Sequence, residues 1–206
     1  MLKFIAVLSM VVDHVGYAIY PDYHVLRVIG RIAFPLFAFS VGSGVHRTTD
    51  LNKYAWRLYF CAMVSQIPYG LLFHWRGLDV VWSFLFAVLV FKDHMDWNTP
   101  GYRPALLFIC FSLLSEFLHV DYGFYGMVLT LLFMLCADAL WMCALFLLTM
   151  TVLQCLYVGS WLQLWCLLSL PFIYLYRDGD FQWLPRRFFY YFYPVHMFLI
   201  YILGVL

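Results

Sequence analysis

Charged residues are scarce in this chain. Lysine, arginine, aspartate and glutamate make up 11% of its 206 residues, whereas a soluble domain carries about 25%. A surface in contact with water needs more charge than this, so the composition excludes a fully solvated globular protein. Hydrophobic residues make up 66% of the chain, which suits a surface facing lipid, where apolar side chains are favourable and charges are costly. We therefore predict an integral membrane protein.

The chain also lacks a strong charge imbalance and a polar linker. Its formal net charge of +1 gives no basis for binding nucleic acid, and we expect none as a partner. Without a linker or a low-complexity tract, residues 1–206 are predicted to form a single transmembrane domain. The first residues have no small-residue cleavage site, so they are predicted to remain as a first helix rather than to act as a signal peptide.

Motifs of metal and nucleotide sites are missing as well. The six cysteines lie in apolar stretches, with no CxxC pair and no histidine at metal-ligand spacing, so we interpret them as packing residues and predict no metal. No HExxH, GxSxG, P-loop or dinucleotide-binding fingerprint occurs. The chemistry that those motifs mark is thus not expected here.

Long apolar runs are what the sequence has in abundance. Measured against the ~20 residues that a helix needs to cross a bilayer, they predict an all-α, polytopic membrane bundle of about 8–9 transmembrane helices. Almost no loop separates the two runs that meet at residues 136–139, which leaves open a re-entrant segment. The nine predicted segments are Phe4–Tyr20, Leu26–Val45, Tyr54–Phe73, Leu78–Phe91, Pro104–Leu118, Gly123–Cys136, Ala139–Val158, Trp161–Tyr176 and Phe188–Leu206.

Basic residues predict the orientation of these segments. With the N-terminus inside, most of the 12 basic residues fall on the inner side and only Arg27, Arg31 and Arg76 on the outer side. The positive-inside rule favours this arrangement, so we predict a cytoplasmic N-terminus. The inner basic residues are Lys3, Arg47, Lys53, Arg57, Lys92, Arg103, Arg177, Arg186 and Arg187.

Several polar side chains lie inside the predicted spans, where they are costly to bury. Asp13 and His14 lie ~14–15 Å from the inner end of the first span, at a rise of ~1.5 Å per residue. Arg31 lies ~7 Å below the outer surface by the same count. Gln66 and His196 reach comparable depths in the third and last spans. Together these residues form a predicted intramembrane constellation.

One pairing within this constellation leaves a base available. We predict that Asp13 and Arg31 form a buried ion pair and that His14 is free to take up and release a proton. The alternative is a pair that only fixes helix register, with His14 bonded to a backbone carbonyl. His24, in the outer turn, ranks second to His14 for a site that opens outward.

Two further patterns allow both a structural and a functional interpretation. Arg47, Lys53 and Arg57, and Arg186 with Arg187 before the last span, either hold the loops inside or bind a phosphorylated cytosolic cofactor. The stretch Ala38–Gly44 has small residues at i, i+4 spacing, which indicates either close helix packing or room for a ligand against the backbone.

Taken in order, the motifs of this chain resemble those of the TraX family over nearly its whole length. The Asp13-His14 pair and the run Gly30–Phe39 are the most specific of them. The sequence departs from the family pattern at Leu78–Ser83, which bears on the acceptor pocket. The motifs are Leu2–Ala6, Met10–Gly16, Leu26–Phe39, Tyr54–Arg57, Ser65–Pro68, Tyr122–Gly123 and Phe192–His196.

This resemblance implies a transmembrane acyltransferase of the bacterial inner membrane. Such proteins pass an acetyl group from cytosolic acetyl-CoA to an acceptor, best known as the N-terminus of conjugative pilin. Carried onto this chain, the intramembrane base is His14, with Asp13 and Arg31 beside it, and the motif residues Tyr122 and Tyr193 are further candidates. The acceptor stays open between a pilin, another membrane peptide, a glycan and a lipid head group, with an amine favoured over a hydroxyl.

Two other classes remain on the sequence alone. A small transporter would use the aspartate, histidine and arginine as a proton relay, although neither internal repeats nor matching broken helices are visible. A structural subunit of a secretion or conjugation assembly would need no chemistry from them.

Overall fold

The computed structural model describes residues 1–74, 76–96, 100–176 and 188–205. Within these ranges every secondary-structure element is helical, which confirms the predicted all-α class. The elements are α1 (Leu2–Ala18), α2 (His24–Gly30), α3 (Ala33–Arg47), α4 (Leu51–Phe73), α5 (Val80–Met95), α6 (Tyr102–Phe117), α7 (Gly123–Leu135), α8 (Leu140–Val158), the 3₁₀ helix η1 (Trp161–Ser169), α9 (Leu170–Tyr176) and α10 (Phe188–Val205).

The second predicted span is interrupted in the structure. Residues 31 and 32 form a turn, so that α2 and α3 are separate helices instead of one. Pro35 is the third residue of α3 and has no N–H to bond with the carbonyl of Arg31, so the helical hydrogen-bond pattern is interrupted at that carbonyl. The break leaves Arg31 at a helix end, directly beside α1.

The eighth predicted span also differs. Its first part, Trp161–Ser169, is the 3₁₀ helix η1, and only the last turns form α9. Pro171 has no N–H for the carbonyl of Leu167, and that carbonyl accepts instead from the N–H of Leu170, three residues on. The other predicted segments match helices to within a few residues.

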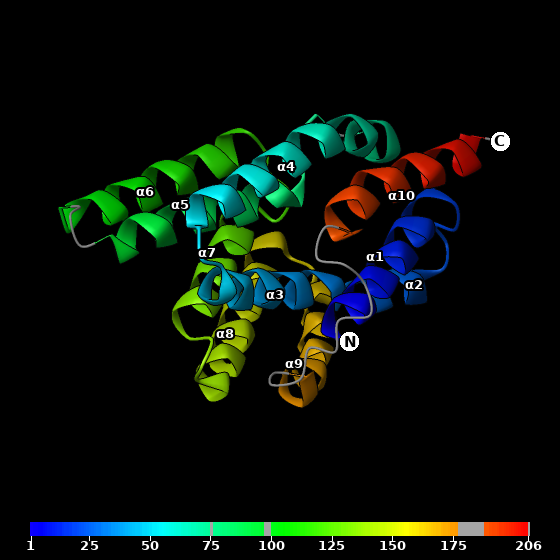
Figure 1. The fold of residues 1–206 in the computed structure, drawn as a ribbon. Coiled ribbons are helices and arrows are strands. Elements are labelled where there is room, and N and C mark those ends of the chain that lie inside the picture. The colour runs from blue at the N-terminus through cyan, green and yellow to red at the C-terminus, as the bar shows by residue number, and fades with distance from the viewer. Residues whose placement is uncertain (75, 97–99, 177–187, 206) are drawn as a thin grey trace.

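Figure 1 shows how the helices are arranged. Helices α4, α5 and α6 lie alongside one another, α3 runs through the middle, and α8 and α9 project to the other side. The C-terminal helix α10 packs on α4 and on α1, and α2 packs back along α1. The first and last helices of the described chain therefore lie side by side, and that is where the site is built.

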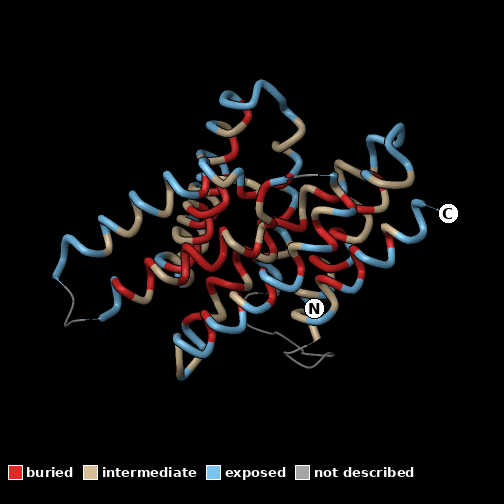
Figure 2. The backbone as a smooth tube through the Cα atoms, turned by 90° about the horizontal axis from the view of Figure 1, so that it is seen from above, coloured by how far each residue is buried: buried red, intermediate tan, exposed pale blue. Residues whose placement is uncertain are grey.

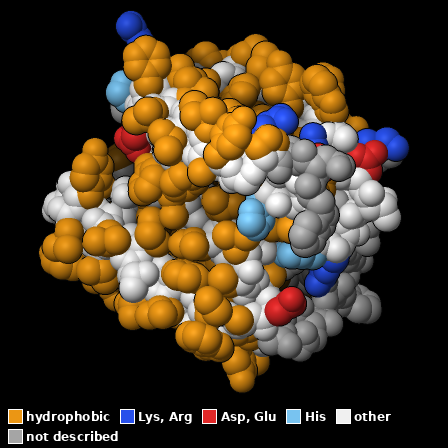
Figure 3. All heavy atoms as spheres, turned by 90° about the vertical axis from the view of Figure 1, so that its left-hand side faces the viewer, with side chains coloured by type: hydrophobic (Ala, Val, Ile, Leu, Met, Phe, Trp, Pro, Cys, Tyr) orange, Lys and Arg blue, Asp and Glu red, His pale blue; other side chains and the backbone are white. Residues whose placement is uncertain are grey.

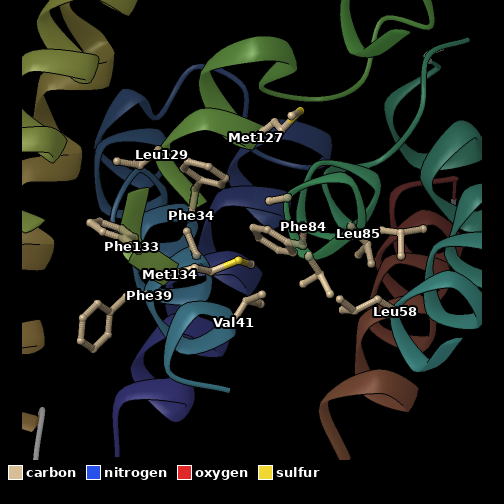
Figure 4. Close-up of a cluster of buried hydrophobic side chains, with 14 of the residues drawn as sticks. Phe34, Phe39, Val41, Leu58, Phe84, Leu85, Met127, Leu129, Phe133 and Met134 are labelled. Carbon is tan, nitrogen blue, oxygen red and sulfur yellow. The ribbon is translucent and has the colours of Figure 1, made fainter. Parts of the chain in front are cut away.

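The core lies where α3, α4, α5 and α7 meet. Figure 2 shows buried residues in the centre of the molecule and exposed residues around it, and Figure 4 shows Phe34, Phe84 and Phe133 among the buried side chains of this core. Gly42 permits close packing, because a Cβ at that position would lie 3.1 Å from the backbone of Phe133 on α7. Part of the small-residue stretch is thus a packing face.

Much of the outer surface is apolar. Phe117, Trp141 and Tyr157 are at least 70% exposed, and hydrophobic side chains cover most of the face in Figure 3. Three stretches, His24–Arg47, Leu140–Val158 and Phe188–Val205, are long and apolar enough to cross a bilayer. Such a surface is stable in lipid and costly in water.

Candidate active site

Asp13 is held by two arginines. Its Oδ1 accepts from Arg31 Nη2 at 2.8 Å and its Oδ2 from Arg27 Nη1 at 2.8 Å. The predicted Asp13–Arg31 pair is confirmed, and Arg27 completes a triad that the sequence reasoning missed. Their i, i+4 spacing places Arg27 and Arg31, the C-cap residue of α2, on the same side, and it was the available signal. The side chains of Asp13 and Arg31 are 13% and 12% exposed.

Two glycines, Gly16 and Gly30, make room for this triad. At Gly30 a Cβ would overlap the side chain of Asp13, and at Gly16 it would lie 2.6 Å from Cβ of Leu26. Without side chains at these two positions, α1 and α2 approach closely enough for the carboxylate to reach both guanidinium groups.

His14 pairs with the second intramembrane histidine. Nδ1 of His14 lies 2.9 Å from Nε2 of His196 on α10, and Nδ1 of His196 lies 2.9 Å from the carbonyl of Phe192. The two imidazoles stack, with centroids 5.0 Å apart and an interplanar angle of 14°. Both residues are buried. The sequence predicted the shared depth of these residues but not their contact.

Tyr122 joins the other side of the triad. Its hydroxyl accepts from Arg31 Nη1 at 3.2 Å, and its ring stacks on Phe34 with centroids 4.2 Å apart. Tyr122 has φ 62°, a left-handed conformation that is unfavourable for a bulky side chain. Beside it, burial raises the pKa of Asp121 to about 6, against the opposing effect of Arg31.

A cavity of about 150 Å³ joins these groups. It is lined by Asp13, His14, Arg27, Arg31 and Tyr122. His196 is not among its lining residues. A small molecule in this cavity would therefore contact a histidine, a tyrosine hydroxyl and a guanidinium–carboxylate cluster.

A larger cavity of about 500 Å³ adjoins the first. Met10, Phe37, Val80, Phe84 and Tyr193 line both cavities. The larger cavity lies between α1, α3, α4, α5 and α10, and these five residues form a wall that it shares with the small cavity at His14.

The far end of the larger cavity is basic. Arg47 and Arg57, both predicted as cofactor residues, line it together with Lys3, which the sequence reasoning did not select. Ser40 lines it too, and its buried hydroxyl has no hydrogen-bond partner within the described residues. Ser43 and Gly44 also line this cavity, so the second face of the small-residue stretch borders open space.

The structure places three of the other predicted residues outside both cavities. Lys53 is exposed and pairs with Asp50 at 3.4 Å. His24 is exposed at the start of α2. Gln66 donates to the carbonyl of Gly77 at 2.9 Å, which fixes the loop before α5. Arg186 and Arg187 lie outside the described residues. Within the described chain, no three histidine, cysteine or acidic side chains are placed to hold a metal.

Curated relatives are similar over part of the chain. A probable fimbrial assembly protein FimC of Dichelobacter nodosus is 25% identical over 63% of this chain and 59% of its own length. Protein TraX of Escherichia coli K12 is 28% identical over 62% of this chain and 52% of its own length. An uncharacterized protein of Rickettsia prowazekii is 36% identical over 35% of this chain and 27% of its own length.

These alignments span about half the length of the TraX and FimC relatives and about a quarter of the third. No solved structure matches the chain. The family model described as TraX protein, in contrast, matches residues 1–204, and that range contains every residue of the triad, the histidine pair and both cavities. The chain is a membrane protein that belongs to the TraX family.

Proposed function

We propose that this protein is an integral membrane acetyltransferase that moves an acetyl group from cytosolic acetyl-CoA to an acceptor amine or hydroxyl near the outer side of the membrane. One observation carries the proposal: a large cavity with a basic end adjoins a small cavity lined by a histidine. A phosphate-bearing donor that reacts at a buried base needs such a path. An amine acceptor is favoured over a hydroxyl.

The larger cavity fits the donor chemically. Lys3, Arg47 and Arg57 supply cations of the kind that bind phosphate groups. The unpartnered hydroxyl of Ser40 is suited to an amide along the donor's arm, since a buried hydroxyl without a partner is costly. When bound, acetyl-CoA supplies an activated thioester, and the residues of this chain supply binding, proton transfer and charge stabilisation.

Proton transfer falls to His14. Its imidazole takes the proton from the acceptor amine as the amine nitrogen bonds to the acetyl carbon, and it returns the proton to the departing thiolate as the carbon–sulfur bond breaks. The amide and the free thiol are then both neutral. In this scheme Asp13 holds Arg31 in place, and Arg31 in turn orients Tyr122.

Tyr122 is the residue best suited to stabilise the negative charge that develops on the thioester carbonyl oxygen during transfer. Its oxygen accepts from Arg31, which leaves its own O–H proton to donate into the cavity. A neighbouring guanidinium strengthens that donor, and a preorganised donor at a developing oxyanion is typically the largest single contribution to such a reaction. The left-handed backbone at Tyr122 fits a residue held in place for function.

The acceptor is proposed to be the N-terminal amine of a pilin-like peptide. This proposal draws on the family of the chain and on the name of the FimC relative, a probable fimbrial assembly protein. The same reasoning favours a bacterial inner membrane, with the N-terminus and the basic end of the larger cavity on the cytoplasmic side. In that orientation the small cavity lies toward the outer side.

Transfer from radiolabelled acetyl-CoA tests the proposal. Purified protein in liposomes is given the labelled donor and, in parallel, a pilin-like peptide with a free amine, the same peptide with a blocked amine, and a glycan. We expect thiol release and a labelled free-amine peptide. Absence of both, together with proton flux into liposomes loaded with a pH-sensitive dye, would favour a transporter and overturn the proposal.

A further inference from the structure

We propose that His196 is a positioning residue that holds His14 in the tautomer needed for a base. The inference rests on the proposed acetyl transfer and extends it to the last helix, α10. It is carried by the chain of contacts from the carbonyl of Phe192 through His196 to His14.

The carbonyl of Phe192 sets the direction of this chain. A carbonyl oxygen only accepts hydrogen bonds, so Nδ1 of His196, 2.9 Å away, carries the proton. In a neutral imidazole the other nitrogen is then an acceptor, which makes Nε2 of His196 the acceptor in its 2.9 Å contact with His14. Nδ1 of His14 is therefore the donor.

The same logic assigns the second nitrogen of His14. With its proton on Nδ1, neutral His14 carries a lone pair on Nε2. His14 lines the small cavity and His196 does not. Only His14 therefore meets a substrate, and its lone pair is the group that accepts the acceptor's proton. His196 acts through His14.

Because both histidines are buried, His14 depends on His196 as its hydrogen-bond acceptor. His14 is 9% exposed and His196 is 5% exposed, so water does not readily replace a lost partner. If Nδ1–H of His14 lost its acceptor, it would either stay buried and unsatisfied or move its proton to Nε2. The second outcome removes the base, as a wrong histidine tautomer does in serine proteases.

The stacking of the His196 ring allows its role in packing to be separated from its role as a hydrogen-bond acceptor for His14. His196 stacks on Phe192 with centroids 5.1 Å apart and an interplanar angle of 3°, and it also stacks on His14. Phenylalanine at position 196 keeps an aromatic ring but offers no acceptor. Glutamine loses the ring but offers an amide oxygen to His14.

The test compares these two variants by steady-state kinetics in liposomes. We expect His196→Phe to lower kcat by roughly 10²-fold or more, with the KM for acetyl-CoA unchanged, and His196→Gln to regain most of the lost kcat. A Phe variant as active as the unchanged protein would overturn the proposal. A Gln variant as impaired as the Phe variant would also overturn it.

Nitrogen NMR provides a readout that does not depend on turnover. In protein labelled with ¹⁵N-histidine, the His14 signals are assigned by their loss in His14→Ala. We expect Nδ1 of His14 to be protonated in the unchanged protein and Nε2 to be protonated in His196→Phe. Protonated Nε2 in the unchanged protein would contradict the inference. If acetyl transfer is absent altogether, the proposed function fails, while this spectrum still decides the tautomer.

Discussion

Two aspartates in this molecule are held in opposite ways. Asp13 on α1 is bound by the guanidinium groups of Arg27 and Arg31. Asp79, fully buried before α5, is held by uncharged groups, namely the hydroxyl of Ser65 and the backbone N–H of Val81. Asp13 lines the small cavity with His14, whereas Asp79 lines neither cavity.

The burial of Asp79 shows that a buried carboxylate does not by itself mark a functional site. Asp79 is the N-cap of α5, and such a cap stabilises a helix start. Gln66 accepts from its backbone N–H, and with Ser65 it ties the loop before α5 to α4. Asp13 instead holds two cations in place beside an open cavity and a histidine. We therefore assign a structural role to Asp79 and a role in the chemistry to Asp13.

Removing the proposed base, His14, is expected to lower the rate of acetyl transfer more than any other change. His14→Ala should lower the rate of acetyl transfer by roughly 10²–10⁴-fold, the usual contribution of one general base. Thiol release in liposomes measures it, and a retained gel-filtration profile shows that the variant folds. His24→Ala, at an exposed histidine outside both cavities, is the matched control and should keep its activity. Equal activity of the two variants would remove His14 from the mechanism.

The second prediction contrasts the two aspartates directly. Asp13→Ala strands two cations and should lower the free energy of unfolding by about 3–5 kcal/mol. Asp79→Asn keeps a capping side chain and should cost only about 1 kcal/mol while transfer continues. Denaturant unfolding in detergent, read together with thiol release, compares them.

A combined variant tests whether the triad acts as a unit. Replacing Asp13, Arg27 and Arg31 together by alanine should cost less stability than the sum of the three single changes, because no charge is left unpaired. Activity should stay absent, since nothing then orients Tyr122. Strictly additive losses would mean that the three side chains do not interact.

The sequence was sufficient to predict features that depend only on the position of a residue along its helix. Counting residues along the spans placed Asp13, Arg31, Gln66 and His196 at similar depth, and it gave the helices other than those of the second and eighth spans to within a few residues. It did not give the angle of each side chain around its helix. For that reason the contact between His14 and His196, and the turn of Gln66 toward the loop before α5, appeared only with the packing of the helices.

Two other features were missed for different physical reasons. Arg27 was assigned to the outer half of the chain, although its spacing to Arg31 places both on one face. The break at residues 31 and 32 depends on Pro35 four positions later, within a stretch that reads as one continuous apolar span. The small-residue stretch Ala38–Gly44 was interpreted either as a packing face or as room for a ligand. In the structure Gly42 packs against α7, whereas Ser43 and Gly44 line the larger cavity.

Gly30 offers a smaller perturbation of the Asp13 side. Gly30→Ala would push a methyl group into the Asp13 side chain, and we expect roughly a tenfold loss of transfer, about 1.4 kcal/mol of activation free energy. Gly101→Ala is the control, because a Cβ there meets nothing within 4 Å. Full activity of Gly30→Ala, measured in the same thiol assay, would show that the carboxylate tolerates displacement.

The smallest expected effect lies at the basic end of the larger cavity. Arg57→Gln should raise the KM for acetyl-CoA about tenfold, the loss of one charge-assisted hydrogen bond, with kcat unchanged. Lys53→Gln, one helical turn away and outside the cavity, should leave KM unchanged. Equal shifts in both variants would point to a general attraction of the donor by surface charge.

Cryo-electron microscopy of the protein with bound CoA shows whether the larger cavity holds the donor with its thiol at His14. We expect phosphate density beside Arg47 and Arg57 and the thiol within hydrogen-bond reach of Nε2 of His14. CoA bound elsewhere, or a larger cavity without CoA at saturating concentration, would contradict it.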